Sequence, residues 1–234
     1  STMPTLFYTY GAFGTPVTPC YDYFYFGLTI RHWLKQGYSL VVANPRGGCE
    51  YGANWHNAAK GLNKQVTFDD IYSICEQVLD SKITSPKHFG VLGGSGGGLT
   101  AGVMFTQRPD LFNATVSVAG FLDMLRFHEL GQGAFGLSEY GDPDNPDEEK
   151  MLRSYSPYHN LDKDKDYHGP LLMAATLDDR VHPGHVRKMA AKMQNQGHKV
   201  LYYEAKSGGH MLAANNNERA FNAALQSIYL LQRL

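Results

Sequence analysis

Cysteine, excess charge and long apolar runs are all scarce in this sequence of 234 residues. Its cysteines, Cys20, Cys49 and Cys75, are odd in number and lack a C-x-x-C spacing, which fits a reducing, cytoplasmic setting better than a disulfide scaffold. A net charge of −1 argues against a nucleic-acid partner, because proteins that bind nucleic acids usually carry a basic patch. No apolar run approaches the roughly 20 residues of a membrane helix, and no signal-peptide pattern opens the chain, so no membrane partner is expected.

What the sequence does contain is an alternation of strand-like and helix-like segments. The expected strands are residues 5–10, 38–44, 88–93, 113–120, 170–176 and 199–205, and several of them are continuously apolar. The expected helices are residues 67–82 with Thr67 as N-cap, 96–107, 184–197 with a glycine at its end, and 215–234. This alternation predicts an α/β fold with a mostly parallel sheet and helices on both faces.

Two stretches, 15–27 and 121–168, do not follow the alternation. The second includes EYGDPDNPDEEK, residues 139–150, whose acidic side chains are interpreted as a solvated turn. No repeat, linker or low-complexity segment divides the chain, so residues 1–234 are expected to form one domain.

Glycines flank a single serine in GVLGGSGGGLTAG, residues 90–102. The pattern Gly93-x-Ser95-x-Gly97, between a strand and a helix, is typical of a nucleophile elbow, which projects a serine hydroxyl from a sharp turn. Side chains at positions 93 and 97 would collide with the neighbouring strand and helix, so glycine is needed there. The start of the following helix adds free N–H groups near a developing oxyanion.

The same glycines allow two other interpretations. Gly96-x-Gly98-x-x-Ala101 matches a loose dinucleotide-binding fingerprint, with Asp123 beyond the next strand. A purely structural glycine turn is the second alternative. The local pattern does not distinguish the nucleophile elbow from these two alternatives, so residues elsewhere in the chain must do so.

An elbow hydrolase requires an acid and then a base after the serine in chain order. Asp178 follows the expected strand 170–176, and His210 follows the expected strand 199–205, so both lie at carboxyl ends of strands, where open α/β sheets place their sites. His210 would take the Ser95 proton, and Asp178 would fix the tautomer of the imidazole. Asp179 is the competing acid and could instead face solvent.

His182 and His185 form an H-x-x-H pair. A metal site would need a third ligand, and neither C-x-x-C nor H-E-x-x-H supplies one. The two are interpreted as surface or helix-start histidines, and neither a metal nor another cofactor is expected.

With Ser95, Asp178 and His210 identified, the chain resembles the catalytic domain of the prolyl oligopeptidases, the S9 family of serine peptidases. The resemblance extends over nearly the whole chain, in family order, and disfavours the dinucleotide-binding interpretation. The matching stretches are YGAF (10–13), ANPRGGCEYGANWH (43–56), NKQVTFDD (63–70), TSPK (84–87), GGSGGG (93–98), QRPDLF (107–112), DMLRFH (123–128), YSPYHN (155–160), DDRV (178–181) and GGH (208–210).

The resemblance implies an α/β-hydrolase fold and a role for each matching residue. Ser95 matches the family's nucleophile, His210 its base and Asp178 its acid. Tyr10 matches a tyrosine whose hydroxyl forms the oxyanion hole together with the backbone N–H that follows the nucleophile, here that of Gly96. The implied substrate-binding residues are Phe13, Phe135, Tyr140, Arg180 and Val181. Among them, Arg180 matches an arginine that holds a substrate carbonyl, and Phe135 stands near the place of a tryptophan that stacks on proline.

The family also carries a β-propeller before this domain, whereas here Met3, after Ser1 and Thr2, opens directly on the strand of Tyr10. The chain is either a domain separated from its propeller or a stand-alone hydrolase. We expect the latter, with an open site, acting through an acyl-Ser95 intermediate. Esters need less assistance than amides, so a carboxylesterase for small esters is the first expectation. The alternative is a peptidase that cuts short peptides after proline, and a catalytically silent binding domain is disfavoured by the complete triad. An uncovered sheet edge predicts a homo-oligomer.

Overall fold

The computed structural model describes residues 2–20 and 25–234, and Ser1 and residues 21–24 of the stretch 15–27 lie outside the described residues. Its centre is a six-stranded sheet in the order β2-β1-β3-β4-β5-β6, with every neighbouring pair parallel. The strands are β1 (Thr5–Tyr8), β2 (Ser39–Val42), β3 (Phe89–Gly94), β4 (Ala114–Val118), β5 (Leu171–Ala175) and β6 (Leu201–Ala205). All six expected strands are confirmed.

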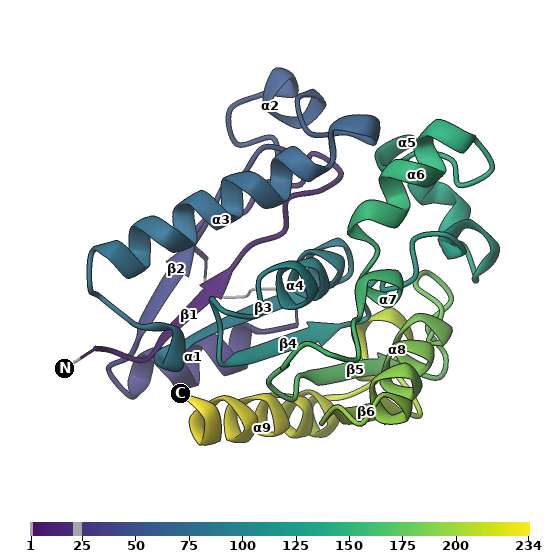
Figure 1. The fold of residues 1–234 in the computed structure, drawn as a ribbon. Coiled ribbons are helices and arrows are strands. Elements are labelled where there is room, and N and C mark those ends of the chain that lie inside the picture. The colour runs from purple at the N-terminus through teal and green to yellow at the C-terminus, as the bar shows by residue number, and fades with distance from the viewer. Residues whose placement is uncertain (1, 21–24) are drawn as a thin grey trace.

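Helices cover both faces of this sheet (Figure 1). The longer ones are α1 (Gly27–Lys35), α3 (Gln65–Asp80), α4 (Gly96–Gln107), α6 (Pro146–Tyr155), α8 (Gly184–Asn195) and α9 (Asn216–Arg233). The shorter ones are α2 (Ala53–Asn57), α5 (Leu137–Tyr140) and α7 (Pro157–Asn160). Within residues 2–20 and 25–234, no helix combines the length and the apolar character needed to cross a membrane.

Side chains of alternate residues along each strand enter different cores. Leu6 and Tyr8 of β1 pack in a cluster with residues of α1 and α9, while Phe7 packs with residues of α3 and α4. The inner strands β1, β3, β4 and β5 are buried from both sides, which explains their continuously apolar sequences, whereas the edge strands β2 and β6 are partly exposed. The expected α/β architecture is confirmed.

One helix begins earlier than the sequence predicts. Thr67 is not an N-cap, because α3 starts at Gln65 after Lys64, with no side-chain cap. Thr67 is fully buried in the first turn, and its hydroxyl donates to the Arg46 carbonyl at 2.8 Å. The side chain thus holds a neighbouring loop instead of the helix end. The predicted glycine at the end of α8 is confirmed, since Gly197 has a φ of +83°.

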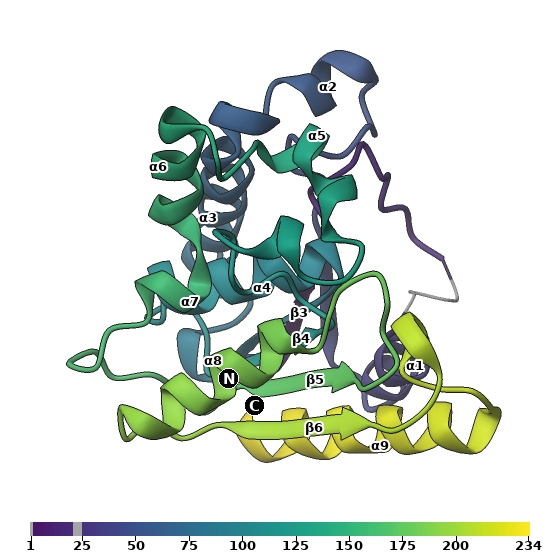
Figure 2. The same ribbon diagram turned by 90° about the vertical axis from the view of Figure 1, so that its right-hand side faces the viewer.

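The irregular stretch 121–168 contains α5, α6 and α7 (Figure 2). The Tyr155 ring, at the end of α6, lies 5.3 Å from the Phe68 ring of α3. The interpretation of residues 139–150 as a solvated turn is wrong in two places. Glu139 is 2% exposed, and residues from Pro146 onward begin α6. Asn145 caps α6, because its side-chain oxygen accepts the Asp147 N–H. The acidic side chains in the first turn interact favourably with the positive end of the helix dipole.

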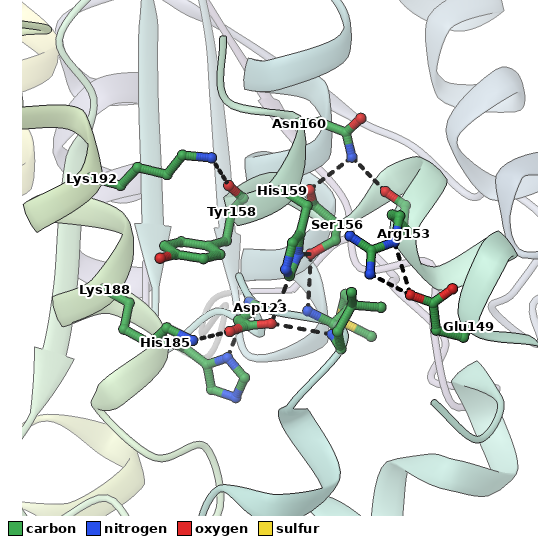
Figure 3. Close-up of polar contacts among 12 residues, drawn as sticks. Asp123, Glu149, Arg153, Ser156, Tyr158, His159, Asn160, His185, Lys188 and Lys192 are labelled. Atoms are coloured by element: carbon green, nitrogen blue, oxygen red, sulfur yellow. Dashed lines mark hydrogen bonds and ion pairs between the residues drawn. The ribbon is translucent and has the colours of Figure 1, made fainter. Parts of the chain in front are cut away.

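A buried carboxylate connects this stretch to α8 (Figure 3). Asp123 is 1% exposed; its side chain pairs with Lys188, and its backbone N–H donates to His185 Nδ1 at 3.2 Å. Asp123 therefore has a structural partner, which agrees with the rejection of a dinucleotide site. His185 stands at the start of α8, as predicted, but it is completely buried and is not a surface residue. Burial lowers the pKa of His185 to about 4, despite the nearby Asp123 carboxylate.

The free energy of unfolding is expected to fall on acidification because of His185. Its folded-state pKa is about 4, whereas an ordinary histidine titrates near 6.5, so between these values the unfolded chain binds more protons. Stability therefore rises with pH across this window and is lost as the pH falls. In His185→Asn, whose amide oxygen can accept the Asp123 N–H, the stability difference between about pH 7 and about pH 4.5 should shrink by on the order of 2 kcal/mol. Urea denaturation at both pH values measures it, and an unchanged difference would contradict the assignment.

Candidate active site

Ser95 occupies the sharp turn between β3 and α4, with φ 57° and ψ −121°. This positive φ is costly for a residue with a side chain, and such strain is common at functional positions. A Cβ atom on Gly93 would lie 1.9 Å from the Gly97 carbonyl oxygen, and one on Gly97 would lie 2.9 Å from the Thr9 carbonyl oxygen. The glycines therefore allow β3, α4 and the neighbouring chain to pack closely around the turn that holds Ser95 at the cavity.

The side chains of Ser95, His210 and Asp178 form a continuous hydrogen-bonded chain. The His210 Nε2 lies 3.1 Å from the Ser95 Oγ, and the His210 Nδ1 lies 2.8 Å from the Asp178 Oδ2. The other Asp178 oxygen accepts the backbone N–H groups of Arg180 and Val181, each at 3.0 Å. The three residues follow β3, β5 and β6, so the carboxyl edge of the parallel sheet brings them together. A serine beside an oriented imidazole is the arrangement of an activated nucleophile.

Two glycines shape the turn that presents His210. Gly208 has a φ of +84°, and a Cβ atom there would lie 2.1 Å from the Ala213 backbone nitrogen. Gly209 also has a positive φ, at +53°. A larger residue at position 208 would displace the loop and with it the imidazole.

The competing acid, Asp179, lies apart from the imidazole. Its side chain is exposed, and one of its oxygens lies 3.4 Å from the Gln132 Nε2. The geometry therefore brings Asp178, and not its neighbour, to His210.

The Tyr10 hydroxyl lies at the start of α4, beside the nucleophile. It is hydrogen-bonded to the Ser95 side chain and to the backbone of Gly96. Burial raises the pKa of Tyr10, so the phenol stays protonated and remains a donor at neutral pH. A Cβ atom on Gly96 would lie 3.1 Å from the Tyr10 Cζ, so the missing side chain leaves room for the phenol.

Replacing Tyr10 with phenylalanine removes one hydroxyl and leaves the ring. If this hydroxyl donates to the developing oxyanion, kcat should fall by roughly 10²–10³, with KM changed much less. Steady-state kinetics on p-nitrophenyl butyrate measure both constants. A kcat equal to that of the wild type would mean that Tyr10 has only a packing role.

An aromatic group stands next to this oxyanion site. The Phe13 ring centroid lies 5.6 Å from that of Phe135 and 5.3 Å from that of Tyr140. The Tyr140 hydroxyl lies 3.1 Å from the position that a Gly96 Cβ would take, so the group reaches the residue after the nucleophile. Val181 is buried in the same apolar cluster. The structure thus brings together four of the predicted pocket residues, with Phe135 at the exposed side, 42% accessible.

Phe121, which was not predicted, also belongs to this aromatic group: its ring centroid lies 5.9 Å from those of Phe135 and Tyr140. Its position just beyond the carboxyl end of β4 was an available signal, because open α/β sheets place their sites at that edge. Nothing in the irregular stretch around it suggested that several aromatic residues would converge.

A cavity of about 250 Å³ opens beside the triad. Its lining includes Ser95, His210, Tyr10 and Arg180, together with residues 15–18 and Cys20. Arg180 is exposed and so is available to a bound molecule. The contribution of residues 15–18 and Cys20 to the lining was not predicted, because this stretch shows no regular pattern.

Both histidines of the H-x-x-H pair accept hydrogen bonds from backbone N–H groups. The His182 Nδ1 accepts the Gly184 N–H at 3.0 Å at the start of α8, and the His185 Nδ1 accepts from Asp123. Across the residues that the structure describes, no group of three or more histidine, cysteine, aspartate or glutamate side chains could hold a metal ion.

Comparisons with known proteins agree with one another. The prolyl oligopeptidase family matches residues 24–233. An uncharacterised peptidase, y4nA, of Sinorhizobium fredii is 44% identical over 233 residues, covering 100% of this chain and 32% of the relative. A prolyl endopeptidase of Dictyostelium discoideum is 39% identical over 228 residues, covering 93% of this chain and 29% of the relative.

Solved structures give the same result. One from a structural and mechanistic analysis of two prolyl endopeptidases has a TM-score of 0.89 and 38% identity, covering 99% of this chain and 34% of that one. A post-proline cleaving enzyme from Rickettsia typhi also has a TM-score of 0.89, with 33% identity and the same coverage of 99% and 34%. The chain therefore spans about a third of the length of the relatives it matches.

Proposed function

Because the chain belongs to the prolyl oligopeptidase family of serine hydrolases and has its α/β-hydrolase fold, we propose that it is a peptidase that cleaves short peptides after proline. The sequence favoured a carboxylesterase first. The relatives are named differently: one is a prolyl endopeptidase and another a post-proline cleaving enzyme. These names favour the peptidase, and the esterase becomes the competing candidate.

The proposed reaction begins at the Ser95 hydroxyl. As the Ser95 Oγ attacks the scissile carbonyl carbon, the His210 Nε2 takes the hydroxyl proton, and Asp178 stabilises the imidazolium through Nδ1. The carbonyl oxygen becomes an oxyanion, to which the Tyr10 hydroxyl and the Gly96 N–H donate. When the C–N bond breaks, His210 gives its proton to the leaving amine, and an acyl-Ser95 ester remains.

Water completes the cycle by the same route. His210 takes a proton from the water as its oxygen attacks the acyl carbon, and the same oxyanion donors act again. Collapse of this second intermediate breaks the ester bond and returns the proton to the Ser95 Oγ. The products are a peptide that ends in a carboxylate and a peptide with a new amino terminus.

The observation that carries the proline preference is the aromatic group next to the oxyanion site. Phe13, Phe135 and Tyr140 present ring surfaces beside Gly96, and an aromatic surface suits the flat, apolar ring of proline. Arg180, at the edge of the cavity, is placed to donate to a carbonyl of the preceding residue. Phenylalanine offers less stacking area than tryptophan, so Phe135 should bind proline less strongly. The esterase therefore remains the competing candidate.

A substrate comparison tests the proposal. The kcat/KM for a Gly-Pro anilide should exceed that for the matched Gly-Ala anilide by at least about 10², or ~2.7 kcal/mol of transition-state stabilisation. Phe135→Ala should lower the value for the Gly-Pro anilide about tenfold while changing that for p-nitrophenyl butyrate little, since the short acyl chain does not need the aromatic surface. Equal, slow cleavage of the two anilides beside rapid hydrolysis of the ester would support the carboxylesterase instead.

A further inference from the structure

A buried lysine and a buried glutamate lie beside the Tyr10 segment and have no part in the mechanism above. Lys64, which precedes α3, is 1% exposed, and Glu139 of α5 is 2% exposed. The Lys64 Nζ donates to the Glu139 Oε1 at 3.0 Å and to the Gly11 carbonyl oxygen at 2.7 Å. Replacing a buried ion pair with apolar residues often costs no stability, so stability alone does not explain this pair.

Glu139 connects separate parts of the chain through its carboxylate. One oxygen accepts from Lys64, the other lies 2.7 Å from the His56 Nε2, and the Phe13 backbone N–H also donates to the group. Burial alone would raise the pKa of Glu139, but the Lys64 ammonium, His56 and the Phe13 N–H together hold it below its usual value. The carboxylate is therefore charged at neutral pH, and its hydrogen bonds are charge-assisted.

The segment that these two residues hold has a strained backbone. Gly11 has a φ of +70° and Phe13 a φ of +55°, the latter being an unfavourable conformation for a phenylalanine. Such a conformation persists only where its surroundings fix it. Here the Gly11 carbonyl is held by Lys64, and the Phe13 N–H is held by Glu139.

We propose that Lys64 and Glu139 are positioning residues that fix the backbone of residues 11–13 and thereby keep the Tyr10 hydroxyl beside Ser95. The inference rests on the proposed function, in which this hydroxyl donates to the oxyanion. A misplacement of about 1 Å at a catalytic group can cost on the order of 10² in rate. The loss of either contact should therefore reduce kcat without removing any group that touches the substrate.

The Glu139 carboxylate also connects Phe13 and Tyr140, two members of the aromatic group. Glu139 directly precedes Tyr140, and it binds the backbone of Phe13, whose ring lies 5.3 Å from that of Tyr140. One ion pair thus sets both the oxyanion donor and the pocket.

A double-mutant cycle tests this role with p-nitrophenyl butyrate as substrate. Lys64→Met should lower kcat by about 10-fold to 100-fold with KM little changed. In the Tyr10→Phe background, the same substitution should cost less than about threefold, because the group that Lys64 positions is already gone. Equal losses in the two backgrounds would overturn the proposal, since independent effects add.

A second variant separates positioning from folding. Lys64→Met combined with Glu139→Met leaves neither charge of the pair alone and fills a similar volume, so its melting temperature should lie above that of Lys64→Met. Its kcat should still fall at least about tenfold, again much less in the Tyr10→Phe background. A stable double variant with wild-type kcat would show that the pair is only structural.

The matched control is Lys188→Met, which removes the cation from a buried carboxylate outside the proposed site, that of Asp123 (Figure 3). It should lower stability and leave kcat within about twofold. If Lys188→Met reduces kcat as much as Lys64→Met does, the positioning role is wrong. Hydrolysis that survives Ser95→Ala would instead overturn the proposed function itself, so the two failures are distinguishable.

Discussion

Ser95→Ala is expected to lower kcat by about 10⁶, the size of the loss seen when the nucleophile of a comparable triad is removed. The Oγ is the atom that His210 contacts at 3.1 Å and the atom that would carry the acyl group. Without it, the imidazole has no hydroxyl to deprotonate. Kinetics on p-nitrophenyl butyrate and mass-spectrometric detection of an organophosphonate adduct measure the loss in two independent ways.

The fold should survive this change, because alanine occupies less space than serine and the strain at φ 57° is already present. Ser154→Ala is the matched control: Ser154 is an exposed serine of α6 whose hydroxyl donates to the Met151 carbonyl. This control should retain both activity and labelling. Labelling of a different residue in the Ser95 variant, with activity retained, would contradict the assignment of the nucleophile.

Asp178→Asn is expected to cost on the order of 10⁴ in kcat by imposing the wrong tautomer on His210. The Asp178 Oδ1 accepts two backbone N–H groups, so an asparagine would keep its oxygen there and turn its NH₂ group toward the His210 Nδ1. The imidazole would then accept at Nδ1 and carry its proton on Nε2. It could no longer take the Ser95 proton.

The adjacent aspartate provides the control for this prediction. Asp179 is exposed and does not contact the imidazole, so Asp179→Asn should change kcat by less than about threefold. Both variants remove one negative charge. A difference between their kcat values therefore reflects hydrogen bonding to His210 and not long-range electrostatics. The reverse ranking of the two kcat values would show that the wrong acid had been chosen.

The features predicted from the sequence are those with local causes. Each strand is a short apolar run, and the elbow around Ser95 depends on glycines within a few residues of one another. Asp178 and His210 could be placed because the carboxyl ends of parallel strands share one edge of a sheet. These inferences needed no knowledge of which distant side chains meet.

The features that were missed depend on contacts between distant segments. Glu139 looks like part of a solvated acidic run, and only the burial of Lys64 beside it reveals an ion pair between residues 75 positions apart. Threonine is a common N-cap residue, yet the Thr67 hydroxyl donates to the Arg46 carbonyl instead of capping the helix. Phe121 lay in a stretch without periodicity. In each case packing overrides the local preference.

The wide spacing of the triad along the chain has a consequence for how the protein folds. Ser95 and His210 are separated by 115 residues, and they meet only after β4, β5 and β6 have paired in parallel register. Sheets with such long-range pairing form slowly, because chain entropy is lost before the contacts that compensate for it are made. Activity should therefore return later than helical structure when the denatured chain is diluted into buffer. The triad is a reporter of the last stage of refolding, since no local portion of the chain contains it.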